Sequence, residues 1–137
     1  HYPLLTVPIP EGIVLEAGAI AALPNQRIAV STRLGDIWFV DGAYENPPVN
    51  ARFTKFASGL HEVLGLHLRP DGWFYATQRG EITRLKDTDG DDRADVFETF
   101  ADGWGIGGDY HEYAFGSKPD REGNMWVVLC LTGSFTS

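Results

Sequence analysis

The chain has 137 residues, of which 43% are hydrophobic and 12% are aromatic, and it carries a net charge of −8. This apolar content is sufficient for one modest core and excludes a disordered chain, and no run approaches the roughly 18 apolar residues of a membrane span. The acidic charge argues against nucleic acid or an anionic membrane surface as the main partner, whereas it permits cations and neutral substrates such as sugars.

The first segment, residues 1–18, is predicted to be an extended lead-in strand or linker. It contains Pro3, Pro8 and Pro10, and proline favours extended segments and strand edges. The chain begins with His1 rather than Met, and it ends shortly after a strongly apolar run. We therefore expect it to be processed or to be a piece of a longer protein.

Residues 19–137 are predicted to be β-structure, because short runs rich in β-branched and aromatic residues alternate with turn residues. Glycine occurs 16 times and proline 8 times, scattered between these runs, and helical periodicity is nearly absent. The segment 41–51 is predicted to connect two sheets. The predicted strands are Ala19–Leu23, Arg27–Ser31, Asp36–Val40, Gly65–Arg69, Trp73–Thr77, Glu81–Lys86, Glu112–Phe115 and Asn124–Leu131.

The chain also repeats itself. The segment Ala21–Val40 aligns with Leu66–Leu85 after one inserted residue near the first turn, so that Thr32 matches Thr77, and a third copy begins within Ala114–Leu129. The spacing of about 45–50 residues suits one four-stranded blade of a β-propeller.

The fold is therefore predicted to be all-β: a partial β-propeller of about three blades, each a four-stranded antiparallel sheet. The blade repeats lie near residues 19–45, 60–100 and 109–137. One small sheet cannot cover both of its faces, whereas sheets stacked around an axis cover the inner ones. We expect the remaining blades in further chain or in a partner. A meander of unrelated hairpins is the alternative.

The densest patch of charge, "DTDGDDRADVFE", begins at Asp87 and holds five aspartates within nine residues. Acidic residues at alternate positions match the ligand spacing of an EF-hand-type calcium loop, in which about six to eight oxygens surround the cation. With Asp87 as the first position, the predicted ligands are Asp87, Asp89, Asp91, the backbone carbonyl of Arg93, Asp95 and Glu98.

Two features of this loop leave alternatives open. The glycine that the sixth position normally requires is replaced by Asp92, so aspartate must adopt an unusual backbone conformation there. Glu98 falls within "VFETF", which has the composition of a strand. Because no helix pair flanks the loop, we expect a structural calcium site in a β setting. A solvated acidic turn between strands is the alternative.

A glycine-rich segment precedes the third repeat. Residues 102–108 contain four glycines, and Asp109, His111 and Glu112 follow them. His61 and Glu62 similarly precede a strand of the second repeat. If the blades stack in order, these acidic residues and histidines line one mouth, since sites gather on the loops at strand ends.

A histidine beside an aspartate at such a mouth has the chemistry of a general base for a hydroxyl proton. The predicted catalytic pair is His111 with Asp109. A histidine that only hydrogen-bonds the neighbouring blade is the alternative. The predicted substrate-binding residues are His61, Glu62, Trp104 and Glu112.

Two stretches resemble a known family: "GLHEVLGLHLRPDGWFYATQRGEITRLKDTDGDDRAD" and "DGWGIGGDYHEYAFGSKPDREGNMWVVLCLTG". They are similar to the propeller domain of large exported proteins of planctomycetes and related bacteria, described as membrane-bound dehydrogenases, which often carry a separate cytochrome c domain. The resemblance covers most of the chain, from about Pro10 onward. That domain is in turn similar to the soluble quinoprotein glucose/sorbosone dehydrogenases, which use pyrroloquinoline quinone and calcium.

This resemblance implies the oxidation of a sugar or alcohol, with His111 as the base and Asp109 as an approximate match to the acid that precedes it. It also implies calcium and pyrroloquinoline quinone as cofactors, a cytochrome c domain as electron acceptor, and a periplasmic or extracellular location. A non-catalytic propeller that is stabilised by calcium and binds carbohydrate or protein is the alternative.

Overall fold

The computed structural model describes residues 3–107 and 111–130, and within them the chain forms β-strands and one short 3-10 turn at Pro24–Gln26. The strands lie in three antiparallel sheets, which confirms the predicted all-β class. They are β1 (Ala17–Leu23), β2 (Arg27–Thr32), β3 (Ile37–Asp41), β4 (Arg52–Ala57), β5 (Gly65–Leu68), β6 (Phe74–Thr77), β7 (Ile82–Lys86), β8 (Val96–Ala101), β9 (Ala114–Pro119) and β10 (Met125–Leu129).

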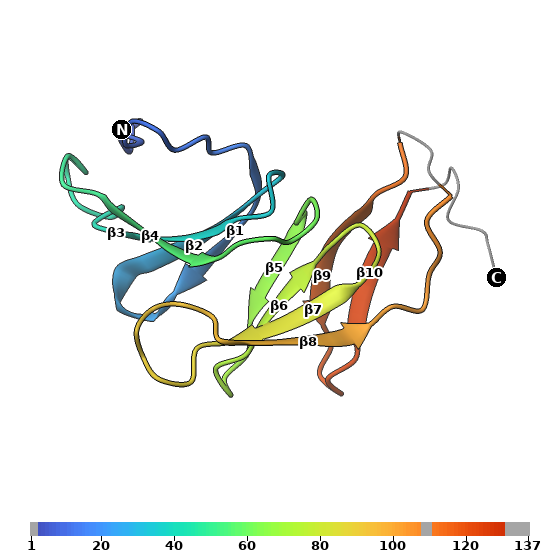
Figure 1. Cartoon of the computed structure of the whole chain (residues 1–137). Helices are drawn as coiled ribbons and strands as arrows, with labels where there is room; N and C mark the ends of the chain where they lie inside the picture. The colour runs from blue at the N-terminus through green and yellow to red at the C-terminus, as the bar shows by residue number, and fades with distance from the viewer. Residues whose placement is uncertain (1–2, 108–110, 131–137) are drawn as a thin grey trace.

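Each of the first two sheets is a four-stranded meander in which consecutive strands pair. The first sheet has the order β1-β2-β3-β4 and the second has the order β5-β6-β7-β8, whereas β9 and β10 form a two-stranded hairpin. Figure 1 shows the three sheets following one another in chain order. Strand β1 contacts β5, and β5 contacts β9, so the first strands of successive sheets are neighbours.

The core lies between the facing surfaces of the first two sheets. Phe39 and Phe56 of the first sheet stack with ring centroids 4.4 Å apart. Phe74 of the second sheet lies 4.9 Å from Phe56 and 5.6 Å from Phe39, and all three rings are buried. Aromatic pairs at such distances contribute about 0.5–1.5 kcal/mol each beyond the burial of their area. This aromatic cluster therefore holds the first two sheets together.

The repeat seen in the sequence is present in the structure, but its register differs by one residue. Thr77 pairs with Ile82 across the turn of the second sheet, whereas the residue that pairs with Ile37 in the first sheet is Ser31. The turn of the first sheet is therefore one residue longer, and Ser31 rather than Thr32 is the structural counterpart of Thr77. The sequence alignment placed its inserted residue near the first turn of the repeat, whereas in the structure the extra residue lies in the turn between β2 and β3.

Strand β4, the last strand of the first sheet, was not among the predicted strands. The segment 41–51 was expected to connect two sheets, but it joins β3 to β4 within the first sheet, so that prediction is wrong. The first sheet consequently extends to Ala57 rather than to about residue 45. The sequence "RFTKFA" of β4 mixes charged and apolar residues because only its last two residues are buried, which weakens its strand pattern.

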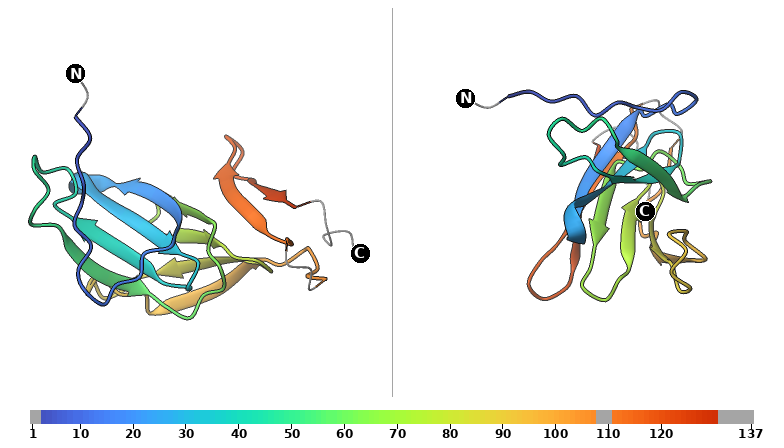
Figure 2. Two further views of the ribbon diagram at one scale, coloured as in Figure 1. Left: turned by 90° about the horizontal axis from the view of Figure 1, so that it is seen from above. Right: turned by 90° about the vertical axis from the view of Figure 1, so that its left-hand side faces the viewer.

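The lead-in segment forms no strand before Ala17 in the part of the chain that the structure describes, and it crosses one face of the first sheet (Figure 2). Its residues Val7 and Ile9 line an apolar groove of about 200 Å³ together with Ile20, Val30 and Phe53 of that sheet. The segment thus covers part of the face that is turned away from the aromatic cluster.

The β9–β10 hairpin packs against the second sheet where Gly65 approaches Gly116. A Cβ atom on Gly65 of β5 would lie 2.7 Å from the Cα atom of Gly116 in β9 and 2.8 Å from Oγ1 of Thr77. The amide of Gly116 also donates to the carbonyl of Leu64 at 3.1 Å. Only a residue without a side chain permits this approach, so Gly65 sets the distance between β5 and β9.

Candidate functional site

The carboxylate of Glu62, which precedes β5, joins two hairpin turns at one end of the sheets. Its Oε1 accepts a hydrogen bond from Arg33 at 3.2 Å, and its Oε2 accepts one from Arg79 at 3.3 Å. Arg33 follows β2 and Arg79 follows β6. Glu62 has a φ of 49°, a left-handed conformation that is costly for a residue with a side chain. Its two ion pairs offset that cost.

Tyr113, which immediately precedes β9, brings the third sheet to the same place. Its hydroxyl oxygen accepts a hydrogen bond from Nη2 of Arg33 at 3.3 Å. The guanidinium carbons of Arg33 and Arg79 lie 5.9 Å and 5.2 Å from the centre of its ring, within the range of cation–π attraction. Arg33, Glu62, Arg79 and Tyr113 therefore form one group, called the rim cluster below, to which all three sheets contribute.

A cleft of about 390 Å³ opens beside the rim cluster and is lined by Arg33, Leu64, His111, Tyr113 and Phe115. This volume falls in the range of about 300–1,000 Å³ that is usual for small-molecule sites. His111 is exposed at this cleft, so its imidazole is accessible to a substrate.

One predicted substrate-binding residue, Glu62, belongs to the rim cluster, and two others, His61 and Trp104, lie beside it. His61 is adjacent to it, with Nε2 3.8 Å from Oε2 of Glu62, and its side chain is exposed. The indole of Trp104 donates to the backbone carbonyl of Arg79 at 2.9 Å, so it supports the β6–β7 turn and does not line the cleft. The histidine and glutamate that precede β5 thus lie at the same end of the molecule as His111.

Glu112 and Asp109 are the other two site residues that were predicted beside His111. Glu112 is only 3% exposed, and both of its carboxylate oxygens accept from the amide of Gly107 at 2.6 Å. It is therefore placed to order the glycine-rich segment rather than to contact a substrate directly. Asp109, the predicted catalytic partner of His111, lies outside the described residues.

The sequence interpretation missed the two arginines and Tyr113. A usable signal was present, because Arg33 and Arg79 both occur in the turn between the second and third strands of their sheets. These turns read "TRLGD" and "TQRGE", so the repeat itself places one arginine from each sheet at the same end. Glu62, whose carboxylate pairs with both arginines, was predicted to bind substrate, but its role as their shared partner was not predicted.

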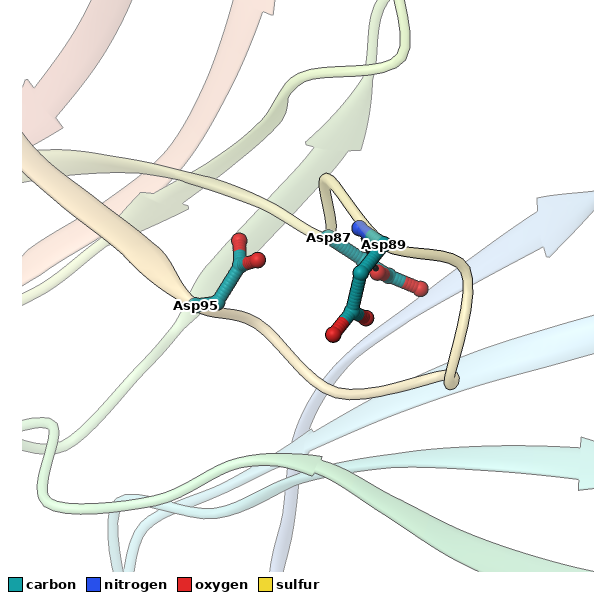
Figure 3. Close-up of side chains that lie close together, drawn as sticks. All are labelled: Asp87, Asp89 and Asp95. Atoms are coloured by element: carbon teal, nitrogen blue, oxygen red, sulfur yellow. Dashed lines mark hydrogen bonds between the residues drawn. The ribbon is translucent and has the colours of Figure 1, made fainter.

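The acidic loop joins β7 to β8 and brings three of its predicted ligands together (Figure 3). Asp87, Asp89 and Asp95 each offer a carboxylate oxygen, and these oxygens all lie within 4.8 Å of one another. Hard cations such as Ca²⁺ prefer oxygen ligands of this kind. Asp89 and Asp95 are exposed and Asp87 is partly buried, so the group is open to solvent.

Asp87 organises the backbone of this loop. Its carboxylate accepts from the amides of Asp89 at 3.2 Å, Gly90 at 2.7 Å and Asp92 at 2.9 Å. Partial desolvation acts to raise the pKa of Asp87, but the hydrogen bonds from Gly90, Asp92 and Asp89 outweigh it and hold the pKa below its usual value. Asp87 is thus kept ionised, as a metal ligand must be.

Two of the remaining predicted ligands, the carboxylates of Asp91 and Glu98, do not join this group. Asp91 is exposed and accepts from the backbone amide of Arg93 at 2.9 Å. Glu98 lies in β8 and pairs with Arg84 of β7, whose Nη2 and Nε are 2.5 Å and 2.7 Å from its carboxylate. The strand composition of "VFETF" therefore decides the position of Glu98.

Asp92 takes the left-handed conformation that its position in the loop requires, with a φ of 66°. Its carboxylate receives two hydrogen bonds from Arg27 of β2, at 2.7 Å and 2.9 Å. Arg27 also donates twice to Asp41 of β3, at 2.7 Å and 3.0 Å. These bonds, with that to Asp92 the largest cause, raise the pKa of Arg27 further above its usual value. The acidic loop of the second sheet is thereby tied to the first sheet.

Comparison with protein-family models, with curated proteins and with solved structures finds no match for this chain. Within the described ranges, none of the helical structure has the length and hydrophobicity that crossing a membrane would require. The function must therefore be inferred from the geometry and chemistry of the chain.

Proposed function

We propose that this chain forms about three blades of a β-propeller in an exported dehydrogenase-like protein, and that the rim cluster lies at the mouth of its substrate site. The observation that carries the proposal is the convergence of the three sheets at this end. Arg33, Arg79 and Tyr113 come from different sheets, and the first two meet on Glu62. The cleft beside them has the volume of a small-molecule site.

The propeller part of the proposal rests on the order of the sheets. In a propeller the first strand of each blade faces the axis, so the first strands of neighbouring blades lie beside one another. Strands β1, β5 and β9 have this relation. The β9–β10 hairpin also exposes Trp126 and Val128, an apolar pair that fits against the face of a further sheet.

His111 is the proposed base. An exposed imidazole at the cleft can take the proton from a substrate hydroxyl while the carbon that bears the hydroxyl loses hydride to an acceptor. The tyrosine and arginine beside it would orient the substrate through its oxygens. The substrate class is a sugar or an alcohol, the location is periplasmic or extracellular, and a cytochrome c domain is the proposed final electron acceptor.

The described residues do not by themselves fit pyrroloquinoline quinone. The quinone carries several carboxylates, whereas the rim cluster has two guanidinium groups that already share the carboxylate of Glu62. Among the described residues that line the cleft, Arg33 alone carries a permanent positive charge, and one such charge does not match several carboxylates. If this quinone is the acceptor, residues outside the described ranges must hold it, and we derive no step through it.

An oxidation assay of the intact protein tests the proposal. It uses calcium, pyrroloquinoline quinone, a panel of sugars and alcohols and a dye acceptor, and it compares the parent with His111→Ala. Loss of a general base is expected to lower kcat by about 100- to 10,000-fold. His67→Ala is the matched control, because His67 lies within β5 and does not line the cleft. Absence of quinone-dependent turnover by the parent would exclude a quinone-dependent dehydrogenase and favour the non-catalytic binding module.

The second candidate is a non-catalytic propeller that binds carbohydrate or protein and is stabilised by calcium. The observation that favours it is the group of carboxylates from Asp87, Asp89 and Asp95, which needs no catalytic residue elsewhere. A protein that binds sugars without oxidising them, and whose melting temperature rises with calcium, would have this function.

A further inference from the structure

We propose that the cleft beside the rim cluster selects a sugar acid, and that Arg33 receives its carboxylate. This inference rests on the proposed function, because it assigns a substrate class to the same site. The expected substrate is a hexuronic acid such as D-glucuronate, whose carboxylate would pair with the guanidinium while its hydroxyls reach toward His111 and Tyr113.

The first support is local charge. Among the described residues that line the cleft, Arg33 carries the one permanent charge, so this lining is cationic. The whole chain has a net charge of −8, which makes a cationic cleft unusual on its surface. Glu16 acts on Arg33 only as its weakest electrostatic partner, and Glu112 does not line the cleft. A neutral sugar would offer Arg33 no counter-charge from the side of the cleft.

The second support is the hydrogen-bonding capacity of Arg33. A guanidinium group has five N–H donors in a planar fork that matches a carboxylate. Across the described part of the chain, the side-chain hydrogen bonds of Arg33 come from Nη2 alone, to Glu62 and Tyr113. Donors at Nε and Nη1 therefore remain for an incoming oxyanion.

The third support is the difference in burial between the ion-pair partners. The side chain of Arg33 is 48% exposed, whereas those of Glu62 and Arg79 are 18% and 17% exposed. Glu62 and Arg79 thus form the floor of the cluster and hold Arg33 in place, while Arg33 faces the cleft. A ligand can reach its guanidinium without displacing Glu62.

The fourth support is that Arg33 and His111 line the same cleft. A ligand held by its carboxylate at Arg33 is therefore kept beside the imidazole proposed to act on a hydroxyl. Fixing one end of a substrate in this way favours one hydroxyl over its neighbours, because the reacting group is presented in one orientation. Arg33 is in this view a specificity-determining residue, and His111 the base.

The test is a binding titration of the intact protein, followed by calorimetry, with D-glucuronate and with D-glucose as the matched neutral sugar. We expect glucuronate to bind at least about tenfold more tightly at low ionic strength, a difference that salt reduces because Arg33 is half exposed. Arg33→Gln is expected to abolish the preference, and Arg33→Lys to keep part of it, since lysine retains the charge but not the fork.

Arg84→Gln is the matched control. Arg84 is also an exposed arginine in an ion pair, with Glu98, and it lies over the ring of Trp73 outside the cleft. This variant loses the same charge and is expected to retain the preference. Circular dichroism spectra show whether each variant is folded. If Arg33→Gln does not fold, Arg33→Lys serves as the comparison instead.

Equal affinity for the two sugars, no measurable binding of either, or an unchanged preference in Arg33→Gln would each overturn the inference. So would a result in which Arg33→Gln weakens the binding of pyrroloquinoline quinone and leaves that of glucuronate unaltered, because the carboxylate at Arg33 would then belong to the quinone. Glucuronate that binds through Arg33 but is not oxidised would support the inference and contradict the proposed dehydrogenase activity.

Discussion

At the scale of single residues, Asp92 differs from the calcium-loop motif and forms a structural ion pair instead. A calcium loop normally has glycine at this position. Asp92 adopts the backbone conformation of glycine, and its carboxylate forms a two-point ion pair with Arg27. The substitution thus costs some backbone strain and provides a tie between the first two sheets.

The variant Asp92→Asn tests this tie. Asparagine tolerates the left-handed conformation, so the change removes mainly the charge that pairs with Arg27. Because 40% of the Asp92 side chain is exposed, solvent screens the pair, and we expect a loss of only about 0.5–1 kcal/mol in the free energy of unfolding. Urea denaturation measures it. Asp91→Asn is the control, since Asp91 is exposed and, among the described residues, its carboxylate accepts only from the nearby amide of Arg93. An equal loss in both variants would contradict the prediction.

The unusual conformation of Asp92 could be predicted from the sequence, but its partner could not. Position six of a calcium loop requires a left-handed residue whatever occupies it. Arg27, in contrast, is 65 positions away in the chain, and only the packing of one sheet beside the other brings it close. The same holds for Arg33, Glu62 and Tyr113 of the rim cluster. The local sequence therefore predicts the backbone conformation of a turn residue, whereas its side-chain partner depends on how the sheets pack.

At the scale of elements, the acidic loop is expected to be a calcium site built by three of its carboxylates. Their mutual repulsion at distances within 4.8 Å destabilises the folded loop until a cation compensates it. Binding to the folded state alone adds about 2.7 kcal/mol at a calcium concentration 100 times Kd. The melting temperature is therefore expected to rise by several degrees at millimolar calcium, and calcium chelation should reverse the rise.

Two variants separate the loop from its flanking strand. Asp89→Asn removes one of the three clustered carboxylates and is expected to abolish most of the calcium response. Glu98→Gln is the control, because Glu98 pairs with Arg84 across β7 and β8 and lies outside the cluster. A calcium response that is lost equally in both variants would restore Glu98 as a ligand, and a melting temperature that calcium leaves unchanged would remove the site.

The strands illustrate which elements a sequence pattern can identify. The inner strands of the two four-stranded sheets were predicted closely, because they are apolar and mostly buried, as β2 and β6 are. Strand β4 was missed because it is an edge strand with polar residues on its exposed part. Strand β9 begins at Ala114 rather than at Glu112, since Tyr113 is drawn into the rim cluster.

At the scale of the whole molecule, His67 links stability to pH. It lies in β5, and burial lowers its pKa, with Lys118 and Arg69 adding repulsion. The unfolded chain binds a proton below a pH of about 6.5, which the folded chain resists. The free energy of unfolding should therefore decrease as the pH is lowered from about 7 to about 5, which is above the range in which carboxylates titrate. His67→Gln should flatten this part of the curve, and an unchanged slope would contradict the assignment.

The assembly of the three sheets depends on the close contact between β5 and β9. Gly65→Ala places a methyl group 2.7 Å from the Cα atom of Gly116, and this neighbour is backbone that cannot turn aside. The hairpin must shift away from the second sheet, so we expect a loss of about 1–3 kcal/mol in the free energy of unfolding. Gly103→Ala is the matched control, because a Cβ atom there would meet no atom of the described residues within 4 Å.

The same variant also tests whether the rim cluster depends on how the sheets stack. Tyr113 precedes the hairpin that Gly65→Ala displaces, so its contact with Arg33 should weaken and the cleft should change shape. Amide chemical-shift changes in an NMR spectrum are expected at residues 33 and 113 in Gly65→Ala and not in Gly103→Ala. If the spectrum changes only around β5 while the rim stays as it is, the cluster is held by Glu62 and its two arginines alone, and the third sheet is not needed to form it.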